Sequence, residues 1–221
     1  MKCLIVSVNY SDILKYTLPY NKHHFEEILV VTHPDDNQTI NIALDNEVQL
    51  YLTQSFYSRG AHFNKWSPTE EGLDRLGRSG PLCLLDADIM LPKDSEITST
   101  HGRLIIPKRR MAPLGEPPPE NEWGQYPLDN FQGWAGYCMI FNGSDPVLLR
   151  RPWFKPWIHA GGGDTEFEQR WRKDHKLRSN FEVLHIGEPR TNWCGRSEAD
   201  KKRLRKIMEN RAINGMVDER L

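Results

Sequence analysis

Short apolar runs separated by helical segments constrain the fold of this chain more than any other feature. The clearest runs cover residues 2–8 (KCLIVSV), 27–32 (EILVVT) and 82–85 (LCLL), and a weaker one covers 48–52. Continuous aliphatic runs of this length are typical of strands that are buried on both faces of a parallel sheet. A helix is expected at 12–20 and another before residue 82. Strands that alternate with helices predict an α/β domain with an open, mostly parallel sheet.

The second of these helices has clear signals at both ends. Ser67-Pro68-Thr69-Glu70 reads as a capping box with proline at the first helical position, which predicts a start at Ser67. Gly77 is the expected end, because glycine readily takes up the left-handed conformation that closes a helix.

The second half of the chain is less regular. Six prolines between residues 107 and 133, interspersed with aromatic residues, predict a long mobile loop that faces a substrate. Strands are expected at 137–141 and 181–186, and a helix at 165–176. A further helix is expected from Ser197 to about residue 210, with a capping signal at its start.

Composition narrows the class of protein. The chain has 221 residues, with 29 Lys+Arg against 30 Asp+Glu, so one domain without a strong overall field for nucleic acid or membrane is expected. No run approaches the roughly 20 apolar residues that a membrane span needs, so we expect a cytoplasmic protein that does not enter the membrane. The four cysteines form no C-x-x-C pair and are expected to be free thiols.

Two carboxylates follow the buried run at 82–85. In Asp86-Ala87-Asp88 the acidic side chains are spaced by two, so they leave an extended strand on the same side and together favour a hard divalent cation. Ligands of open α/β sheets gather at the carboxyl ends of the strands, where these residues are expected. A helix cap or a turn is the alternative interpretation, since D-x-D is common by itself.

Two later segments add candidate groups. His185 ends the strand expected at 181–186, either as a buried core residue or as a metal ligand, and an imidazole among carboxylates suits Mn²⁺ better than Mg²⁺. The glycines at 161–163 permit close approach of a ligand to the backbone. Asp164 either caps the following helix, with Glu166 favouring the helix dipole, or acts as a general base.

Taken together, these segments resemble GT-A-fold glycosyltransferases, and in particular the galactosyltransferase and N-acetylgalactosaminyltransferase branch. Residues 84–92 (LLDADIMLP) resemble the D-x-D strand, 161–171 (GGGDTEFEQRW) the glycine-plus-acid segment, and 63–65 (FNK) a short F-N-K/R element. Residues 133–136 (GWAG) resemble the acceptor-side strand and 185–196 (HIGEPRTNWCGR) the late metal-binding histidine. The order matches from about residue 2 to 196. One departure is Gly163, where the family usually has an acid before the aspartate.

The resemblance implies a single GT-A-like domain over residues 1–221, with a nucleotide-sugar-binding half at 1–92 and an acceptor half at 93–221. It implies transfer of a sugar from a nucleoside-diphosphate donor, a UDP-sugar above all, to a hydroxyl with inversion at the anomeric carbon. Asp88 and His185 would hold Mn²⁺ (or Mg²⁺), with Asp86 on the metal or the ribose, and Asp164 would be the base. The implied donor-binding residues are Asn9, Asp35, Asp36, Asn64, Lys65, Asp86 and Arg196; the implied acceptor-binding residues are Trp123, Trp134, Gly162, Gly163 and Glu166.

The acceptor is left open. The basic clusters Lys108–Arg110 and Lys201–Lys206 are either solvated faces or contacts to the phosphates of a DNA acceptor. Small phage enzymes of the kind that the chain resembles glycosylate hydroxymethylated DNA bases, and a phage-encoded protein would work in the host cytoplasm. A polysaccharide or a protein is an equal alternative.

Two other classes of protein remain as alternatives. A sugar-phosphate nucleotidyltransferase would use a similar sheet, but it normally has a glycine-rich basic loop after the first strand, and SVNYSDILKY has none. The other alternative is a binding module without catalytic activity.

Overall fold

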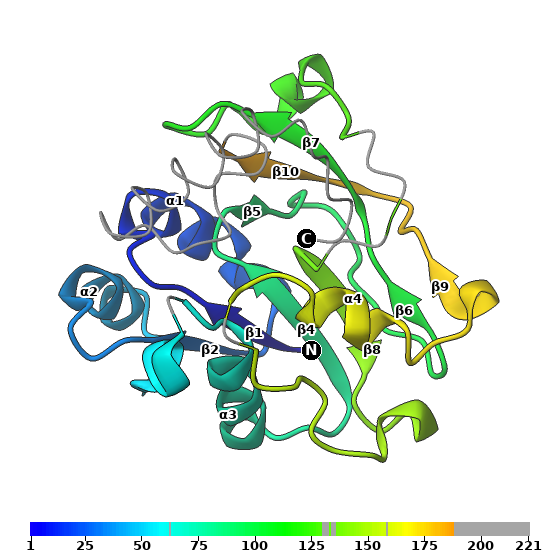
Figure 1. The fold of residues 1–221 in the computed structure, drawn as a ribbon. Coiled ribbons are helices and arrows are strands. Elements are labelled where there is room, and N and C mark those ends of the chain that lie inside the picture. The colour runs from blue at the N-terminus through cyan, green and yellow to red at the C-terminus, as the bar shows by residue number, and fades with distance from the viewer. Residues whose placement is uncertain (62, 130–132, 134–135, 158, 188–221) are drawn as a thin grey trace, which may run out of the picture.

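A seven-stranded sheet forms the centre of the protein (Figure 1). The computed structural model describes residues 1–61, 63–129, 133, 136–157 and 159–187, so the helix expected at 197–210 lies outside the described residues. The strand order is β3-β2-β1-β4-β8-β6-β9. The strands are β1 (Lys2–Val6), β2 (Glu27–Thr32), β3 (Gln49–Leu52), β4 (Pro81–Asp86), β6 (Leu104–Ile105), β8 (Cys138–Asn142) and β9 (Lys176–Leu177). All except β8 run in the same direction, which confirms the predicted α/β class with a mostly parallel sheet.

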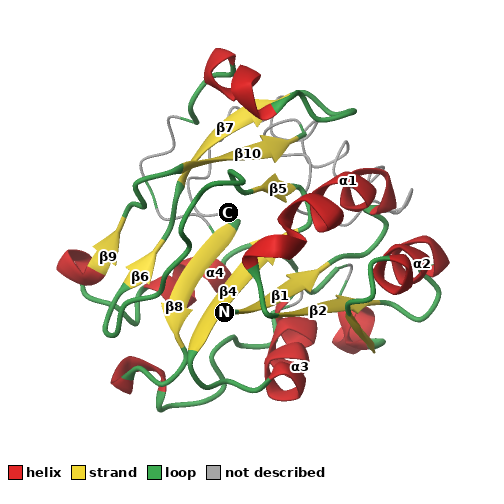
Figure 2. Cartoon of the chain, turned by 180° about the vertical axis from the view of Figure 1, so that it is seen from behind, coloured by secondary structure: helices red, strands yellow, loops and turns green. Residues whose placement is uncertain are grey.

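Helices cover both faces of this large sheet (Figures 1 and 2). Helices α1 (Ser11–Asn21) and α2 (Asn37–Asp45) lead from β1 outward to β3, whereas α3 (Trp66–Leu76) leads back to β4 on the other side of β1. Because crossovers between parallel strands are right-handed, this reversal puts α3 on the face opposite α1 and α2. Ligands of open α/β sheets bind outside the carboxyl ends of the strands at such a reversal, and we call this place between β1 and β4 the crevice.

The short helix α4 (Gly163–Glu168) lies on the same face as α3. The ring of Phe154 stacks on Trp66 of α3 at 4.8 Å between centroids and on Phe167 of α4 at 4.5 Å. Phe167 also contacts Phe141 of β8 at 5.1 Å. An aromatic layer therefore joins the two helices to the sheet.

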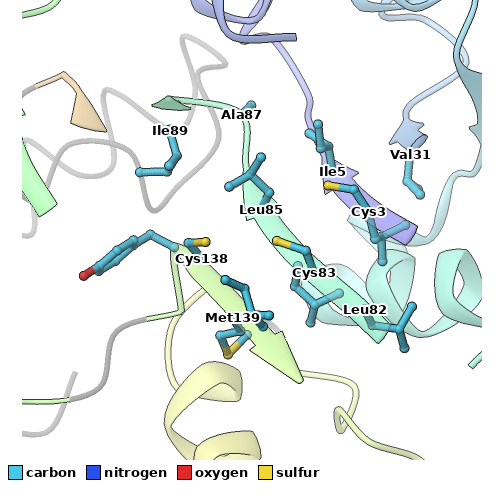
Figure 3. Close-up of a cluster of buried hydrophobic side chains, with 14 of the residues drawn as sticks. Cys3, Ile5, Val31, Leu82, Cys83, Leu85, Ala87, Ile89, Cys138 and Met139 are labelled. Atoms are coloured by element: carbon cyan, nitrogen blue, oxygen red, sulfur yellow. The ribbon is translucent and has the colours of Figure 1, made fainter. Parts of the chain in front are cut away.

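Three cysteine side chains cross the core in neighbouring strands (Figure 3). Cys3 of β1 is opposite Cys83 of β4, and Cys138 of β8 is opposite Leu85 of β4. All three are 0% exposed and free, which confirms the expectation of buried thiols for them. Cys194 lies outside the described residues.

A second, three-stranded sheet stands beside the large one (Figure 1). Its order is β5 (Ile89–Met90), β10 (Glu182–Ile186), β7 (Lys108–Ala112). The prediction of one long loop at 107–133 is wrong in the described part, since this segment contains β7 and the 3-10 helix η3 (Glu120–Gln125). The prolines flank these elements without interrupting them, so no hydrogen bond of the β7–β10 ladder is lost.

Two helix predictions also need correction. The helix expected at 165–176 is α4, which begins at Gly163 and ends at Glu168; η5 (Lys173–His175) and β9 follow it. The predicted capping box at Ser67 is wrong, because the side-chain oxygen of Asn64 accepts from the backbone N–H groups of Trp66 and Ser67 at 2.9 and 3.2 Å. The predicted end of α3 at Gly77, with φ of +83°, is confirmed.

The other short helices are of the 3-10 type and lie in connections: η1 (Lys22–His24), η2 (Ser55–Gly60) and η4 (Pro146–Leu148). Helix α2 follows a turn at 33–36 and was not expected from the sequence. No helix in the described part of the chain combines the length and the apolar character that crossing a membrane requires.

Candidate active site

The acidic triplet lies at the crevice between β1 and β4. Asp86 is the last residue of β4, opposite Val6 of β1, and Asp88 comes just before β5. The backbone of the triplet is held by hydrogen bonds with three other parts of the chain. Asp86 N donates to Tyr137 O at 2.8 Å, Thr17 Oγ1 of α1 donates to Ala87 O at 2.6 Å, and Ile186 N of β10 donates to Asp88 O at 2.8 Å. The positions of the two carboxylates are therefore fixed by the fold.

Asp88 and His185, the two expected metal ligands, are in contact. Nε2 of His185 lies 3.3 Å from Oδ2 of Asp88, and both side chains are buried. The contact follows from sheet pairing, because His185 of β10 is opposite Ile89 of β5. Nδ1 of His185 is also buried and has no hydrogen-bond partner among the described residues. Buried polar groups normally have a hydrogen-bond partner, so this imidazole nitrogen is a candidate to bind a ligand.

Asp86 turns instead to Lys65, the residue that precedes α3. Lys65 Nζ forms an ion pair and hydrogen bond with Asp86 Oδ1. Burial alone would lower the pKa of Lys65, but the attraction of Asp86, and then of Asp164 and Asp88, raises it. The ammonium group is therefore charged and lies within the field of three carboxylates.

The predicted metal ligands fit a divalent cation only in part. No group of three or more His, Cys, Asp or Glu side chains within the described residues is arranged to hold a metal ion, so Asp86, Asp88 and His185 do not form one cluster. Asp88 and His185 supply one carboxylate and one imidazole, a donor set that suits Mn²⁺. Such a pair can bind a metal whose other positions are filled by water and by the oxygens of a diphosphate.

Asp164 joins the site from α4. Its Oδ2 accepts from Gly136 N at 3.0 Å and its Oδ1 accepts from Thr165 N at 2.9 Å. Gly162, with φ of +86°, stands at the helix start, so the interpretation of Asp164 as the N-cap is wrong. A side chain at position 136 would bring Cβ to 2.3 Å from Asp164 Cβ, so only glycine permits this contact.

Gly163 has a packing reason for departing from the family pattern. A Cβ atom there would lie 2.4 Å from the indole ring of Trp66, whose Nε1 donates to Ala160 O at 2.8 Å. Trp66, the neighbour of Lys65, therefore fills the space that an acidic side chain at 163 would need. Position 163 brings α4 close to the start of α3.

Two predicted donor residues serve the scaffold. Asp36 is buried and caps α2: its Oδ1 accepts from Thr39 N at 3.2 Å, and its Oδ2 accepts from Asn9 N at 2.7 Å. Asn64 is 1% exposed and caps α3. Asn9 has φ of +62° and an exposed side chain just beyond β1, so it remains at the crevice. Asp35 is exposed, with its carboxylate 3.5 Å from Nδ1 of His33.

The predicted acceptor residues are spread over several places. Trp123 is 6% exposed, packs 6.0 Å from the ring of Tyr20 and donates from Nε1 to Pro118 O, so it belongs to the packing beneath η3. Glu166 forms an ion pair with Lys155, and Gly162 faces the ring of Trp157. Trp134, Arg196 and Lys201–Lys206 lie outside the described residues.

Sequence reasoning missed two residues that shape the site, Thr17 and Tyr137. Thr17 is buried in α1 and fixes the backbone of the acidic triplet. Burial raises the pKa of Tyr137 to about 12, so its phenol stays protonated and donates to Pro107 O. Both act through contacts between residues far apart in the chain, and only the residue type at 137, an aromatic next to Gly136, offered any signal.

The fold has counterparts among solved structures. No protein-family model and no curated protein matches the sequence. The structure is similar to that of glucosyl-3-phosphoglycerate synthase from Mycobacterium tuberculosis in complex with phosphoglyceric acid, with a TM-score of 0.51 and 13% identity over 99% of this chain and 81% of that one. The same enzyme in complex with Mn²⁺, UDP-glucose and phosphoglyceric acid gives a TM-score of 0.52 and 12% identity over 85% and 72%.

An enzyme that transfers a nucleotidyl group has a similar fold. The inositol-1-phosphate CTP transferase from T. maritima gives a TM-score of 0.50 and 8% identity over 94% of each chain. At such identities the likeness concerns the fold alone. The chain has the GT-A-like α/β fold that these glycosyltransferases and nucleotidyltransferases share, and the finer likeness to the galactosyltransferase branch is not supported by them.

Proposed function

We propose that this protein is a metal-dependent glycosyltransferase that moves a sugar from a nucleoside-diphosphate donor, most simply a UDP-sugar, to a hydroxyl acceptor. The observation that carries the proposal is the buried Asp88–His185 pair beside the Lys65–Asp86 pair, at the crevice between β1 and β4. This crevice is the ligand-binding place of open α/β sheets. A carboxylate, an imidazole and an ammonium group at one place suit a bound metal and a diphosphate.

The residues divide the chemical work as follows. Asp88 and His185 would hold Mn²⁺, which when bound neutralises the charge that develops on the leaving diphosphate. The charged Lys65 would add to this neutralisation while its bond to Asp86 keeps it in place. Asp86 also remains a candidate for the ribose or for the metal.

Asp164 remains the candidate for the general base. Its carboxylate accepts a hydrogen bond from Gly136 N and interacts electrostatically with Lys65, so it lies next to the crevice. A base on this side would take the proton from the acceptor hydroxyl while the diphosphate leaves from the other side, which inverts the anomeric carbon. The proposed inversion depends on this assignment.

The fold likeness is compatible with this function, since one similar structure is of an enzyme in complex with Mn²⁺ and UDP-glucose. Nucleotidyl transfer is the second candidate, because the inositol-1-phosphate CTP transferase is similar over 94% of both chains. The connection after β1, residues 7–10 (SVNY), contains no glycine and no cation with which to cradle a triphosphate. We therefore rank glycosyl transfer first.

Thermal unfolding with nucleotides tests the proposal. UDP with Mn²⁺ at about 100 times its Kd should stabilise the protein by about 2.7 kcal/mol, and Asp88→Asn should lose most of this stabilisation because one of two metal ligands is weakened. Asp94→Asn, which changes an exposed carboxylate, is the matched control and should respond like the unchanged protein.

The same measurement separates the alternatives. Stabilisation by CTP with Mg²⁺ but not by UDP would favour nucleotidyl transfer. Stabilisation by no nucleotide would sink the proposal and favour a binding module. Release of UDP from UDP-sugars, followed by mass spectrometry of candidate acceptors, would then identify the reaction.

A further inference from the structure

A pocket rich in positive charge lies beside the candidate active site. It is lined by Lys108, Arg109, Asp129, Gly133, Tyr137 and Arg178, and we call it the basic pocket. Two guanidinium groups, those of Arg109 and Arg178, stand against the carboxylate of Asp129 in this lining, whereas strand alternation puts the Lys108 side chain on the other face of β7. These three groups carry a net charge of about +1, in a chain whose formal net charge is −1.

Strand register places the basic pocket next to the metal-binding pair. Arg109 of β7 is opposite Val183 of β10, and Met111, two residues on, is opposite His185. Because residues two apart in a strand point to the same face, Arg109 and His185 lie on one face of the small sheet. Tyr137 forms the other link, since it lines the pocket while its carbonyl oxygen accepts from Asp86 N.

The two guanidinium groups of the pocket are held in place by the protein. Nε and Nη2 of Arg109 lie 2.8 and 2.6 Å from Oδ2 of Asp129, and its guanidinium stands 4.5 Å from the centre of the Tyr137 ring. Arg178 donates from Nη2 to Gly133 O at 2.7 Å and from Nη1 to Pro107 O at 3.3 Å. A carboxylate and an aromatic face orient the first guanidinium, and carbonyl oxygens orient the second.

We propose that the basic pocket binds the oxyanion, a phosphate or a carboxylate, of a small acceptor molecule. Planar guanidinium groups that are fixed in advance match the paired oxygens of such groups. That this small molecule is the acceptor rests on the proposed function, since the crevice next to the pocket would supply the sugar. An acceptor anchored at the pocket would extend its hydroxyl past Tyr137 toward Asp164 and Asp86.

The same contacts argue against a nucleic acid at this place. Arg110 points to the opposite face of β7, where its Nε bonds Glu182 at 2.6 Å and its Nη1 donates to the carbonyl oxygens of Gly124 and Tyr126. The Lys108–Arg110 cluster is thus divided between two faces, and two of its three charges are paired with carboxylates. A DNA backbone needs a continuous basic stripe, which this cluster does not provide.

Charge changes of opposite sign test the proposal. Isothermal titration calorimetry at low salt would measure binding of inorganic phosphate, glycerol phosphate and glycerate to the metal-free protein. Arg178→Gln removes one positive charge and should weaken phosphate binding about fivefold, whereas Asp129→Asn removes the one negative charge of the lining and should strengthen it by a similar factor. A structural role alone would weaken binding in both variants. Arg75→Gln, an exposed change on α3, is the control and should leave binding unchanged.

A second titration with saturating UDP and Mg²⁺ separates this site from the donor site. Phosphate binding that persists with UDP present supports the basic pocket, and phosphate that UDP displaces overturns it. Equal affinity in Arg178→Gln, Asp129→Asn and Arg75→Gln would also overturn it, as would binding of a short DNA duplex in preference to glycerol phosphate. If UDP fails to bind while phosphate still responds to both variants, the anion site stands and the proposed sugar transfer falls.

Discussion

The large and the small sheet meet at the turn that carries Asp86 and Asp88, but their side chains differ in kind. The central strands of the large sheet are buried and apolar apart from their end positions. In the small sheet, β7 carries three cations in a row and β10 carries Glu182 and His185. The large sheet therefore fixes the backbone at the crevice, whereas the small sheet supplies charged groups to it.

Substitutions in the packing layer of the large sheet should lower the free energy of unfolding, because they remove buried contacts. Substitutions among the charges of the small sheet should leave that free energy nearly unchanged and should alter binding instead. Three substitutions test this contrast, in decreasing order of the stability loss that we expect.

Phe167→Ala should have the largest effect on stability. The ring is 0% exposed and contacts Phe141, Phe154 and Trp171 at centroid distances between 4.5 and 5.1 Å. Loss of a buried phenyl ring costs about 3–5 kcal/mol, which urea unfolding would measure. Leu177→Ala on β9, where the side chain is 40% exposed, is the control and should stay within about 0.5 kcal/mol. Equal losses in both variants would mean that the aromatic layer is not what holds α4 in place.

Gly163→Ala should have a moderate effect on stability and a clear one on the site. The added Cβ would lie 2.4 Å from the Trp66 ring, and overpacking of this kind costs about 1–3 kcal/mol. Because the ring is next to Lys65, stabilisation by UDP with Mn²⁺ should decrease as well. Gly161→Ala is a matched control, since its Cβ would come no closer than 3.6 Å to His159 Nδ1. An unchanged unfolding midpoint in Gly163→Ala would show that α4 can move away without cost.

Arg110→Gln should have the smallest effect on stability. The Arg110–Glu182 ion pair at 2.6 Å is partly exposed on both sides, and pairs of this kind contribute about 0.2–1 kcal/mol. A double-mutant cycle with Glu182→Gln, read by urea unfolding, would isolate the pair. A coupling free energy above about 2 kcal/mol would contradict this expectation, since the charges of the small sheet would then contribute substantially to the free energy of unfolding.

The sequence predicted well what depends on local pattern. β2 has the predicted bounds, and the acidic triplet and His185 lie at the ends of their strands as expected. Helix α2 was missed because only Thr39 and Ala43 are buried in it, which leaves no apolar stripe. Strand β7 was missed because KRRMA is polar, and its pairing with β10 joins segments about 70 residues apart.

The site was predictable in residue identity but only partly in arrangement. The contact between Asp88 and His185 followed from two strand ends that meet. The Lys65–Asp86 pair did not, because it depends on how α3 returns to β4. Asp36 and Asn64 were expected to bind the donor, but their hydrogen bonds to backbone N–H groups give them capping roles. Residue type indicates chemistry, whereas tertiary contacts decide which groups remain available for a ligand.

The thiols of β1, β4 and β8 can report on how often the core of the protein opens. Cys3, Cys83 and Cys138 are fully buried, and a hydrogen bond with Cys83, followed by burial, raises the pKa of Cys138 well above its usual range. Only the thiolate reacts with thiol reagents, so Cys138 is protected in the folded protein both by burial and by its raised pKa. The rate at which a reagent labels them therefore reports how often the strands that carry the acidic triplet separate. Ligands of the crevice should slow that rate without touching any cysteine.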